Sequence, residues 1–418
     1  MSNKKAPLWG ALTSYLVAYL WIAAFFAGFA AKPELSGNGW LILCFTVVFF
    51  AWGLGILKPK AACREHWFWL AVGLSLALSG AVGRGRAVGW LLYPALHLAA
   101  GYWALCRGGL LSAGESGILL PWDVCCGLLV LPFSQFFLRI VRIFTAIRDG
   151  IQKVIHRKGK QPVQRKDWLP GVLAILAALP ALLLAGRLLG QADPEFARVT
   201  ETLFSFQLIL PNRAQDIFLR LLFAAPVGCY LFGMVGGNLL REKPILTMAK
   251  VREVRPQFRV APKWSVYTVL GGFLGLYLLF FAVQAKHLLA AFAGTVPGTL
   301  TAAAYAREGF FQLCLVMGIN FSLLLAVRLF SREKTVWETG LSAGLMGESI
   351  LLAVTAASKL ILYINRFGFT PLRLLSAWGI LVLTAGCVLA IGALFGWKKT
   401  AKIWILFAAA TFTALCWY

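Results

Sequence analysis

The apolar stretch 341–363 carries ionisable and polar side chains that could do chemistry inside an otherwise apolar helix. These side chains recur at i, i+7, i+11, i+15 and i+18, which is one helix face: Glu348, Thr355, Lys359, Tyr363 and Arg366. A helix separates Glu348 from Lys359 by about 16 Å, so the two charges need partners elsewhere. The pattern fits a polar pathway or anion pocket that opens outward. It fits equally an ion pair between helices, with Lys359 and Arg366 reaching the membrane surface.

A second polar group opens the neighbouring apolar stretch, 308–330. Tyr305, Glu308 and Gln312 share one helix face there. On the topology derived below, this segment and the end of the 341–363 stretch lie on the same outer side of a membrane. Arginine binds phosphate and carboxylate groups through paired hydrogen bonds, so the cations of that side could hold an anionic group: Arg307, Lys359, Arg366 and Arg373. The alternative is an ordinary interfacial anchor with tyrosine and arginine at headgroup depth.

Apolar blocks of about twenty residues, joined by short and mostly basic connectors, must position these side chains. Hydrophobic residues make up 60% of the 418 residues and charged residues 13%, against roughly half and a quarter in a soluble domain. Only helices and closed barrels satisfy the backbone within a bilayer, and continuous apolar runs indicate helices. The sequence predicts an all-α, polytopic transmembrane helix bundle of eleven spans: 8–31, 40–57, 66–83, 87–105, 168–189, 214–240, 264–284, 308–330, 341–363, 372–396 and 401–417.

One further apolar block, 118–138, is predicted to lie on the membrane instead of crossing it. Lys4, Lys5 and the long basic connectors all belong in the cytoplasm, which three crossings between Arg64 and Arg139 would not allow. This block is the weakest candidate because it contains two prolines and three polar residues: Pro121, Asp123, Pro132, Ser134 and Gln135. Its amphipathic continuation is predicted to place cations against lipid headgroups on the cytoplasmic face: Arg139, Arg142, Arg148 and Lys153.

The formal net charge is +24, from 40 basic and 16 acidic residues. The basic residues gather beside apolar blocks, which favours contact with anionic membrane lipids and predicts no nucleic-acid partner. The longest basic stretches, 139–167 and 241–263, could also dock a protein partner. A second amphipathic segment, 195–210, is expected on the outer side. The predicted division of the chain is a four-span region, an interfacial segment and a seven-span region: 1–117, 118–167 and 168–418.

No motif for catalytic or cofactor chemistry is present. The four histidines and nine cysteines lack metal-ligand spacing, and the phosphate-loop, zinc-protease and serine-elbow motifs are missing. No catalytic residue, metal or cofactor is therefore predicted, and an enzyme is disfavoured. His97 is expected to be a hydrogen-bonded core histidine. Three glycine pairs are expected to allow close helix contact: Gly233 and Gly237, Gly271 and Gly275, Gly340 and Gly344.

Four segments resemble one group of bacterial membrane proteins. The YAREGFFQ segment at 305–312 resembles a YxxxGFF-type span start, and KLILYINRFGFTPLRL at 359–374 resembles that group's outer loop. PFSQ at 132–135 and ADPEF at 192–196 resemble its PFSN-type and ADPxF elements. The group is known as domains of unknown function 4153 and 4173.

The resemblance covers roughly residues 120–400. Phe367 and Phe369 stand where the group usually has tyrosine and leucine, and both keep the aromatic and apolar character. The resemblance implies a bacterial origin and a place in the inner membrane, and it implies no particular activity.

Two functions fit these observations. The first is a transporter or flippase-like protein that handles an anionic or amphiphilic substrate through the region of Glu308, Glu348 and Lys359. The second is a non-transporting sensor, regulatory subunit or assembly factor, which the short loops and the missing energy-coupling motifs favour.

Overall fold

The computed structural model describes residues 7–25, 39–58, 64–84, 88–157, 212–292 and 310–418, and the regular elements of this part of the chain are helical. The predicted span 168–189 and the amphipathic segment 195–210 lie outside the described residues. The longer helices are α1 (Leu8–Phe25), α2 (Gly39–Ile56), α3 (His66–Ala81), α4 (Gly89–Gly108), α7 (Leu138–Arg157), α10 (Asn212–Leu240), α12 (Lys263–Phe292), α14 (Phe310–Phe330), α15 (Val336–Phe367), α16 (Pro371–Leu394) and α17 (Thr400–Leu415).

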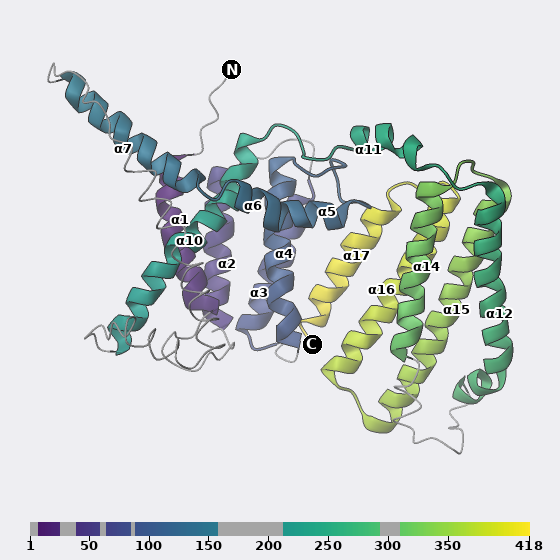
Figure 1. Ribbon diagram of the computed structural model, residues 1–418. Helices are drawn as coiled ribbons and strands as arrows, with labels where there is room; N and C mark the ends of the chain where they lie inside the picture. The colour runs from purple at the N-terminus through teal and green to yellow at the C-terminus, as the bar shows by residue number, and fades with distance from the viewer. Residues whose placement is uncertain (1–6, 26–38, 59–63, 85–87, 158–211, 293–309) are drawn as a thin grey trace, which may run out of the picture.

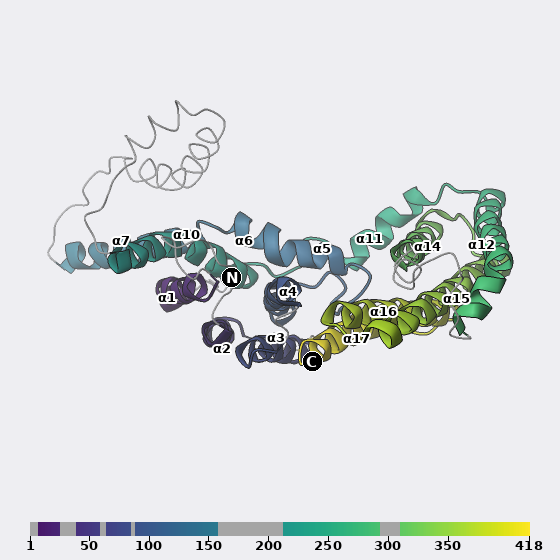
Figure 2. The ribbon, with the colours of Figure 1, turned by 90° about the horizontal axis from the view of Figure 1, so that it is seen from below.

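Most of these helices stand side by side and run alternately in opposite directions (Figure 1). Seen from below, α1, α2, α3, α17, α16 and α15 follow one another in a curved row, and α12 and α14 lie at its far end (Figure 2). Ten of the eleven predicted spans fall on helices that the structure describes. The all-α polytopic bundle is therefore confirmed, and the number of crossings stays a prediction.

Eight stretches within the described residues are long and apolar enough to cross a membrane. Seven of them coincide with predicted spans, and two shorter apolar helices, α3 and α17, coincide with two more. The helix α4 is not among the eight, although it packs along α3. The eighth stretch, Leu120–Asp149, includes the block that was predicted to lie on the membrane.

The helices α5 and α6 of the block 118–138 run crosswise to their neighbours and lie against the sides of α4 and α10 (Figures 1 and 2). It is divided into α5 (Leu120–Cys125), a π-helical turn η2 (Cys126–Val130) and α6 (Leu131–Ser134), and it bends again before α7 begins. Pro132 starts one of these pieces, and Gln135 leaves helical geometry. The interfacial placement of this broken element, which the charges of the flanking connectors predict, stays a prediction.

The backbone of the block 118–138 lies in close contact with α10. A Cβ atom added at Gly233 would come within 2.6 Å of the Pro132 carbonyl oxygen, so a side chain has no room there. The expected close contact is thus observed for the Gly233 and Gly237 pair. It is not observed at Gly271, Gly275 or Gly340, where an added Cβ would meet no described atom within 4 Å.

Buried apolar side chains form two clusters in the described residues. The first joins α1 to α4 and α10, and its largest fully buried side chains include Trp103 and Phe232. The second joins α12, α14, α15 and α16 around Met317 and Leu345. The helix α17 follows α16 in the chain, yet its Ile405 belongs to the first cluster. The helix α10 therefore packs with the four amino-terminal spans, and α17 packs along α16 while it also contacts α3 and the first cluster. The predicted division of the chain stays a prediction.

One end of the bundle collects the basic connectors. The basic connectors 241–262, 331–335 and 395–399 lie on this side, where α11 (Met248–Val254) is also found (Figure 1). The same side holds residues 57–58 and 64–65 and the connector 109–119, which contains Glu115 and no basic residue. Hydrogen bonds link them: Met248 N donates to Ser112 O at 3.1 Å, and Arg107 Nε donates to Leu57 O at 2.6 Å. We refer to this side as the basic end. The turn between α15 and α16 lies at the opposite end.

Candidate functional site

A chain of polar side chains lies buried where α12, α14, α15 and α16 meet. The Tyr277 hydroxyl donates to Asn320 Oδ1 at 2.7 Å, and Asn320 Nδ2 donates to Ser349 Oγ at 2.8 Å. Ser349 is fully buried, its hydroxyl donates to Leu345 O at 2.8 Å, and the Cys387 side chain lies within hydrogen-bonding reach of it. We call these residues the polar junction: Tyr277, Asn320, Ser349 and Cys387.

Glu348 stands beside the polar junction. Its side chain is 9% exposed, and it lies close enough to Tyr277 for the two side chains to interact electrostatically. Its Oε2 atom accepts no hydrogen bond from the described residues, and no ion pair among those residues includes it. A buried carboxylate without such partners is costly in its charged form, so a group of this kind holds a proton or meets a cation.

The depth of this site follows from the helix geometry. Glu348 is 12 residues from the start of α15 at the basic end, which is about 18 Å along the helix axis. Asn320 is 10 residues from the end of α14 on the same side, which is about 15 Å. The hydrocarbon core of a bilayer is about 30 Å thick. The polar junction and Glu348 therefore lie near mid-depth, remote from both surfaces.

The structure separates Glu348 from the outer residues predicted with it. Tyr363 and Arg373 lie together where α15 turns into α16, with the guanidinium 4.2 Å from the ring centroid. Arg373 Nη1 also donates to Phe367 O at 2.7 Å and to Gly368 O. Arg373 thus satisfies carbonyl groups at the end of α15, which a helix leaves without internal partners.

The remaining predicted residues of this region are spread out. Lys359 is half-buried on α15, Arg366 is exposed near its end, and Gln312 is exposed near the start of α14. Tyr305, Arg307 and Glu308 lie outside the described residues. The outward cationic cluster around Glu308 therefore stays a prediction.

Comparison with known proteins bears on this architecture. Residues 15–418 match the family described as Domain of unknown function (DUF4153). The chain belongs to the DUF4153 family. The match confirms the resemblance seen in the sequence and extends it over α2, α3 and α4, which carry none of the quoted motifs. Neither the curated proteins nor the solved structures contain a match to the chain.

In this DUF4153 protein Arg139 lies inside the bundle, in a different position from the predicted headgroup contact. Its Nε donates to Ala11 O at 3.0 Å and its Nη1 to Ala225 O at 3.2 Å, while the guanidinium lies 5.3 Å from the Tyr15 ring centroid. The side chain is 9% exposed. Arg139 therefore joins α7 to α1 and α10, and its hydrogen bonds go to protein carbonyls.

The other cations predicted to meet headgroups lie further along α7. Arg142 is half-buried, and Arg148 is exposed and forms an ion pair with its neighbour Asp149 at 3.1 Å. The side chain of Lys153 lies outside the described residues. The amphipathic character of α7 suits a headgroup role for the exposed part of this helix.

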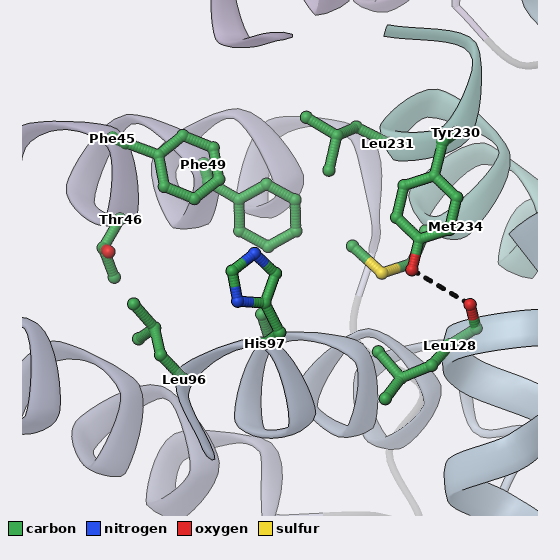
Figure 3. A pocket seen from close by; sticks show the side chains of 10 residues that line it. Phe45, Thr46, Phe49, Leu96, His97, Leu128, Tyr230, Leu231 and Met234 are labelled. Atoms are coloured by element: carbon green, nitrogen blue, oxygen red, sulfur yellow. Dashed lines mark hydrogen bonds between the residues drawn. The ribbon is translucent and has the colours of Figure 1, made fainter. Parts of the chain in front are cut away.

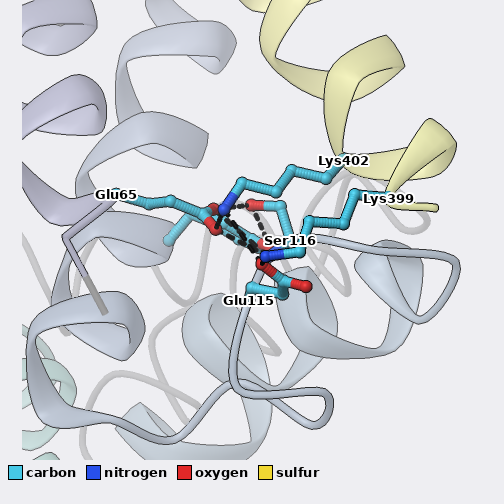
Figure 4. Close-up of polar contacts among 6 residues, drawn as sticks. Glu65, Glu115, Ser116, Lys399 and Lys402 are labelled. Atoms are coloured by element: carbon cyan, nitrogen blue, oxygen red, sulfur yellow. Dashed lines mark hydrogen bonds and ion pairs between the residues drawn. The ribbon is translucent and has the colours of Figure 1, made fainter. Parts of the chain in front are cut away.

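A polar cluster that was not predicted joins the start of α3 to α17 at the basic end (Figure 4). Lys402 Nζ lies 2.6 Å from Glu65 Oε1 and 3.0 Å from Glu115 Oε2, and Lys399 lies 3.2 Å from Glu115. Ser116 donates to Glu65 through its hydroxyl and its backbone N–H. Glu65 is 8% exposed. The hydrogen bond from Lys402 holds the pKa of Glu115 below its usual range.

His97 is a satisfied core residue, as predicted. Its Nε2 accepts a hydrogen bond from Trp21 Nε1 at 2.8 Å, so its Nδ1 carries the proton and donates to Tyr93 O at 2.8 Å. The ring lies in an apolar pocket between α2, α4 and α10 whose lining includes Phe45, Phe49, Leu96, Leu128, Tyr230 and Met234 (Figure 3). Both ring nitrogens are occupied, which leaves His97 no free atom for a ligand.

Proposed function

We propose that this DUF4153 protein is a transporter or flippase-like protein of the bacterial inner membrane, in which Glu348 carries a proton or a cation. The observation that supports this function is the buried Glu348 carboxylate near mid-depth, whose Oε2 atom accepts no hydrogen bond from the residues that the structure describes. Ionisable groups at that depth are costly, and they mark substrate or ion pathways more often than they serve stability. The polar junction beside it supplies hydroxyl and amide groups from several helices.

An anionic or amphiphilic substrate suits the charge of the opposite end. The described connectors there carry Arg84, and Arg366 and Arg373 stand at the helix ends. Asp216 near the start of α10 is an acidic residue described at this end, and the three arginines outnumber it. Arginine recognises phosphate and carboxylate groups in preference to other ligands. A substrate with such a group would meet cations first and the Glu348 region afterwards.

We further propose that the basic end faces the cytoplasm, with the amino terminus on the same side. Short connectors rich in lysine and arginine stay in the cytoplasm during insertion. Reporter fusions after Arg148 and after Tyr418 test this orientation. We expect a cytoplasmic signal from the first fusion and a periplasmic signal from the second. A periplasmic signal from the fusion after Arg148 would mean that the block 118–138 crosses the membrane.

The transport proposal is tested with a fluorescent phosphatidylglycerol in proteoliposomes, by following its exposure to a quencher on one side with and without a pH gradient. We expect the wild-type protein to speed translocation and Glu348→Gln to slow it at least tenfold. Glu338→Gln is the matched control, because Glu338 is equally buried on α15 but accepts a hydrogen bond from Ser331 at the basic end. It should retain translocation.

The outcomes separate the two functions. Loss of translocation in Glu348→Gln, with unchanged elution and unfolding temperature, supports the proposal. If Glu348→Gln only lowers the unfolding temperature and translocation survives, Glu348 is a structural residue. If the wild-type protein moves no lipid under either condition, the flippase role fails and the non-transporting sensor or assembly factor is favoured.

A further inference from the structure

A group of arginines lies at the basic end, where the segment after α11 packs against α14. Arg255 opens a single 3₁₀ turn, η3 (Arg255–Phe258), and its Nη2 donates to Arg328 O at 2.9 Å. The Phe258 ring meets the Phe330 ring with centroids 6.4 Å apart. These contacts fix η3 beside the last turn of α14, so that Arg255 and Arg328 lie together.

The next residues continue this alignment. Ala261 N donates to Phe330 O at 3.0 Å, and Arg332 N donates to Ala261 O at 3.2 Å. Ala261 and Ser331 thereby form an isolated parallel bridge. Arg259 and Arg332 therefore stand on two chain segments that are tied to each other. We call the four residues the arginine cluster: Arg255, Arg259, Arg328 and Arg332.

The arginine cluster has hydrogen-bond donors that the described protein does not use. A guanidinium has five N–H groups. Arg255 gives one hydrogen bond to Arg328 O, and Arg328 gives one to Ala393 O at 3.3 Å. The Nε atoms of Arg255 and Arg259 are buried and donate to no described residue. Both residues are half-buried, so an acceptor from outside the protein would reach the exposed part of each guanidinium group and not its Nε atom.

The neighbouring carboxylates have partners of their own. Glu333 forms an ion pair with Lys263 at 2.7 Å, and Glu338 accepts from Ser331 at 2.6 Å. Glu253 is exposed. None of the ion pairs found within the described ranges joins an acidic residue to the arginine cluster. The cluster therefore keeps its positive charge available for an anion.

Exposed aromatic side chains lie at the same level. Trp264 at the start of α12 is 70% exposed, Trp337 at the start of α15 is 76% exposed, and Phe258 is 51% exposed. Tryptophan and other aromatic rings at the ends of spans mark the membrane–water interface. An anion that meets the arginine cluster at this depth comes from the headgroup layer of the membrane.

We propose that the arginine cluster is a binding site for the phosphate group of an anionic phospholipid in the leaflet at the basic end. The paired donors of arginine match two phosphate oxygens, and the exposed Phe258 of the same turn packs against Phe330 beside them. This inference is independent of the proposed transport function, because none of these residues belongs to the polar junction.

Native mass spectrometry of the full-length protein tests the site by counting bound lipid during titration with phosphatidylglycerol or phosphatidylcholine. We expect tight binding of phosphatidylglycerol alone, and at least tenfold weaker binding in Arg255→Gln/Arg259→Gln. The control is Lys243→Gln/Lys250→Gln, which removes two exposed cations of the same end and should weaken binding less than threefold. Equal loss in the two double variants would mean diffuse attraction and would overturn the site.

Arg259→Gln alone guards against a folding defect, because it leaves the hydrogen bond from Arg255 to Arg328 O intact. It should fold as the wild type does and still bind phosphatidylglycerol more weakly. Inorganic phosphate supplied as a competitor distinguishes the source of the anion. Displacement of the lipid by millimolar phosphate would identify a free-phosphate site and refute the lipid assignment.

Discussion

Replacement of Lys402 by methionine tests whether charges at the basic end hold α17 to the first core. The change removes the ammonium group that lies between Glu65 and Glu115 and keeps the length of the side chain. Glu65, 8% exposed, would then keep hydrogen bonds from Ser116 alone. Removing one partner of a buried ion pair costs about 3–5 kcal/mol, and because Lys402 is 24% exposed we expect the lower value, about 3 kcal/mol.

Lys399→Met is the matched control for this prediction. This substitution also removes one positive charge from the same cluster. The Lys399 side chain, however, is 61% exposed, and among the described residues its ion pair is with Glu115. Exposed ion pairs contribute about 0.2–1 kcal/mol, so we expect a loss of about 0.5 kcal/mol. The control separates the loss of a buried partner from the loss of one positive charge.

Unfolding of the purified variants in mixed micelles, followed by tryptophan fluorescence, measures both free energies. Adding Glu65→Gln to Lys402→Met should recover at least about 1 kcal/mol relative to the sum of the single losses, because the double variant buries no unpaired charge. Two results would refute the reasoning: a Lys402→Met loss no larger than that of Lys399→Met, or strict additivity in the double variant.

Three further predictions concern other parts of the molecule. The pKa of Glu115 is lowered in the folded protein, so its contribution to stability is complete above about pH 4.5 and is lost as the pH falls through its folded pKa. The unfolding temperature of Glu115→Gln should therefore decline less in acid than that of the wild type. Gly233→Ala should cost about 1–3 kcal/mol, since the Pro132 carbonyl blocks the new methyl group, whereas Gly271→Ala should be neutral or stabilise by up to about 1 kcal/mol in the same unfolding assay. Asn320→Leu should cost about 1–3 kcal/mol, because each hydrogen bond between membrane helices contributes about 0.6–1.7 kcal/mol and two are lost. An unchanged free energy of unfolding would show that the polar junction does not tie the helices together.

The helices were predictable because an apolar block of about twenty residues has almost no other stable form in a bilayer. The interfacial placement of the block 118–138 rests on the charges on both sides of it, which restrict the number of spans, and it stays a prediction. Glu348 was found because a carboxylate stands out within an apolar block. Its neighbours Tyr277 and Asn320 were not singled out, since one tyrosine or asparagine in a span is a weak signal by itself.

Residues whose partners lie on other helices were the ones that sequence reasoning missed or misplaced. Arg139 fits the polar face of an amphipathic helix, and nothing local shows that α1 and α10 close over it. Glu65 and Lys402 stand at the starts of two apolar blocks and carry opposite charges, which was an available signal for a contact. Helical periodicity describes one helix at a time, so it does not say which helices become neighbours.

The packing of α17 has a consequence for how the protein is made. Membrane helices enter the bilayer in the order of synthesis, so α1 to α4 are inserted long before α17 leaves the ribosome. The first core contains Ile405 of α17, and Lys402 is the cation that neutralises Glu65. Until α17 arrives, the amino-terminal helices hold an incomplete core and an unpaired carboxylate, which is the kind of nascent intermediate that insertion chaperones and membrane proteases inspect.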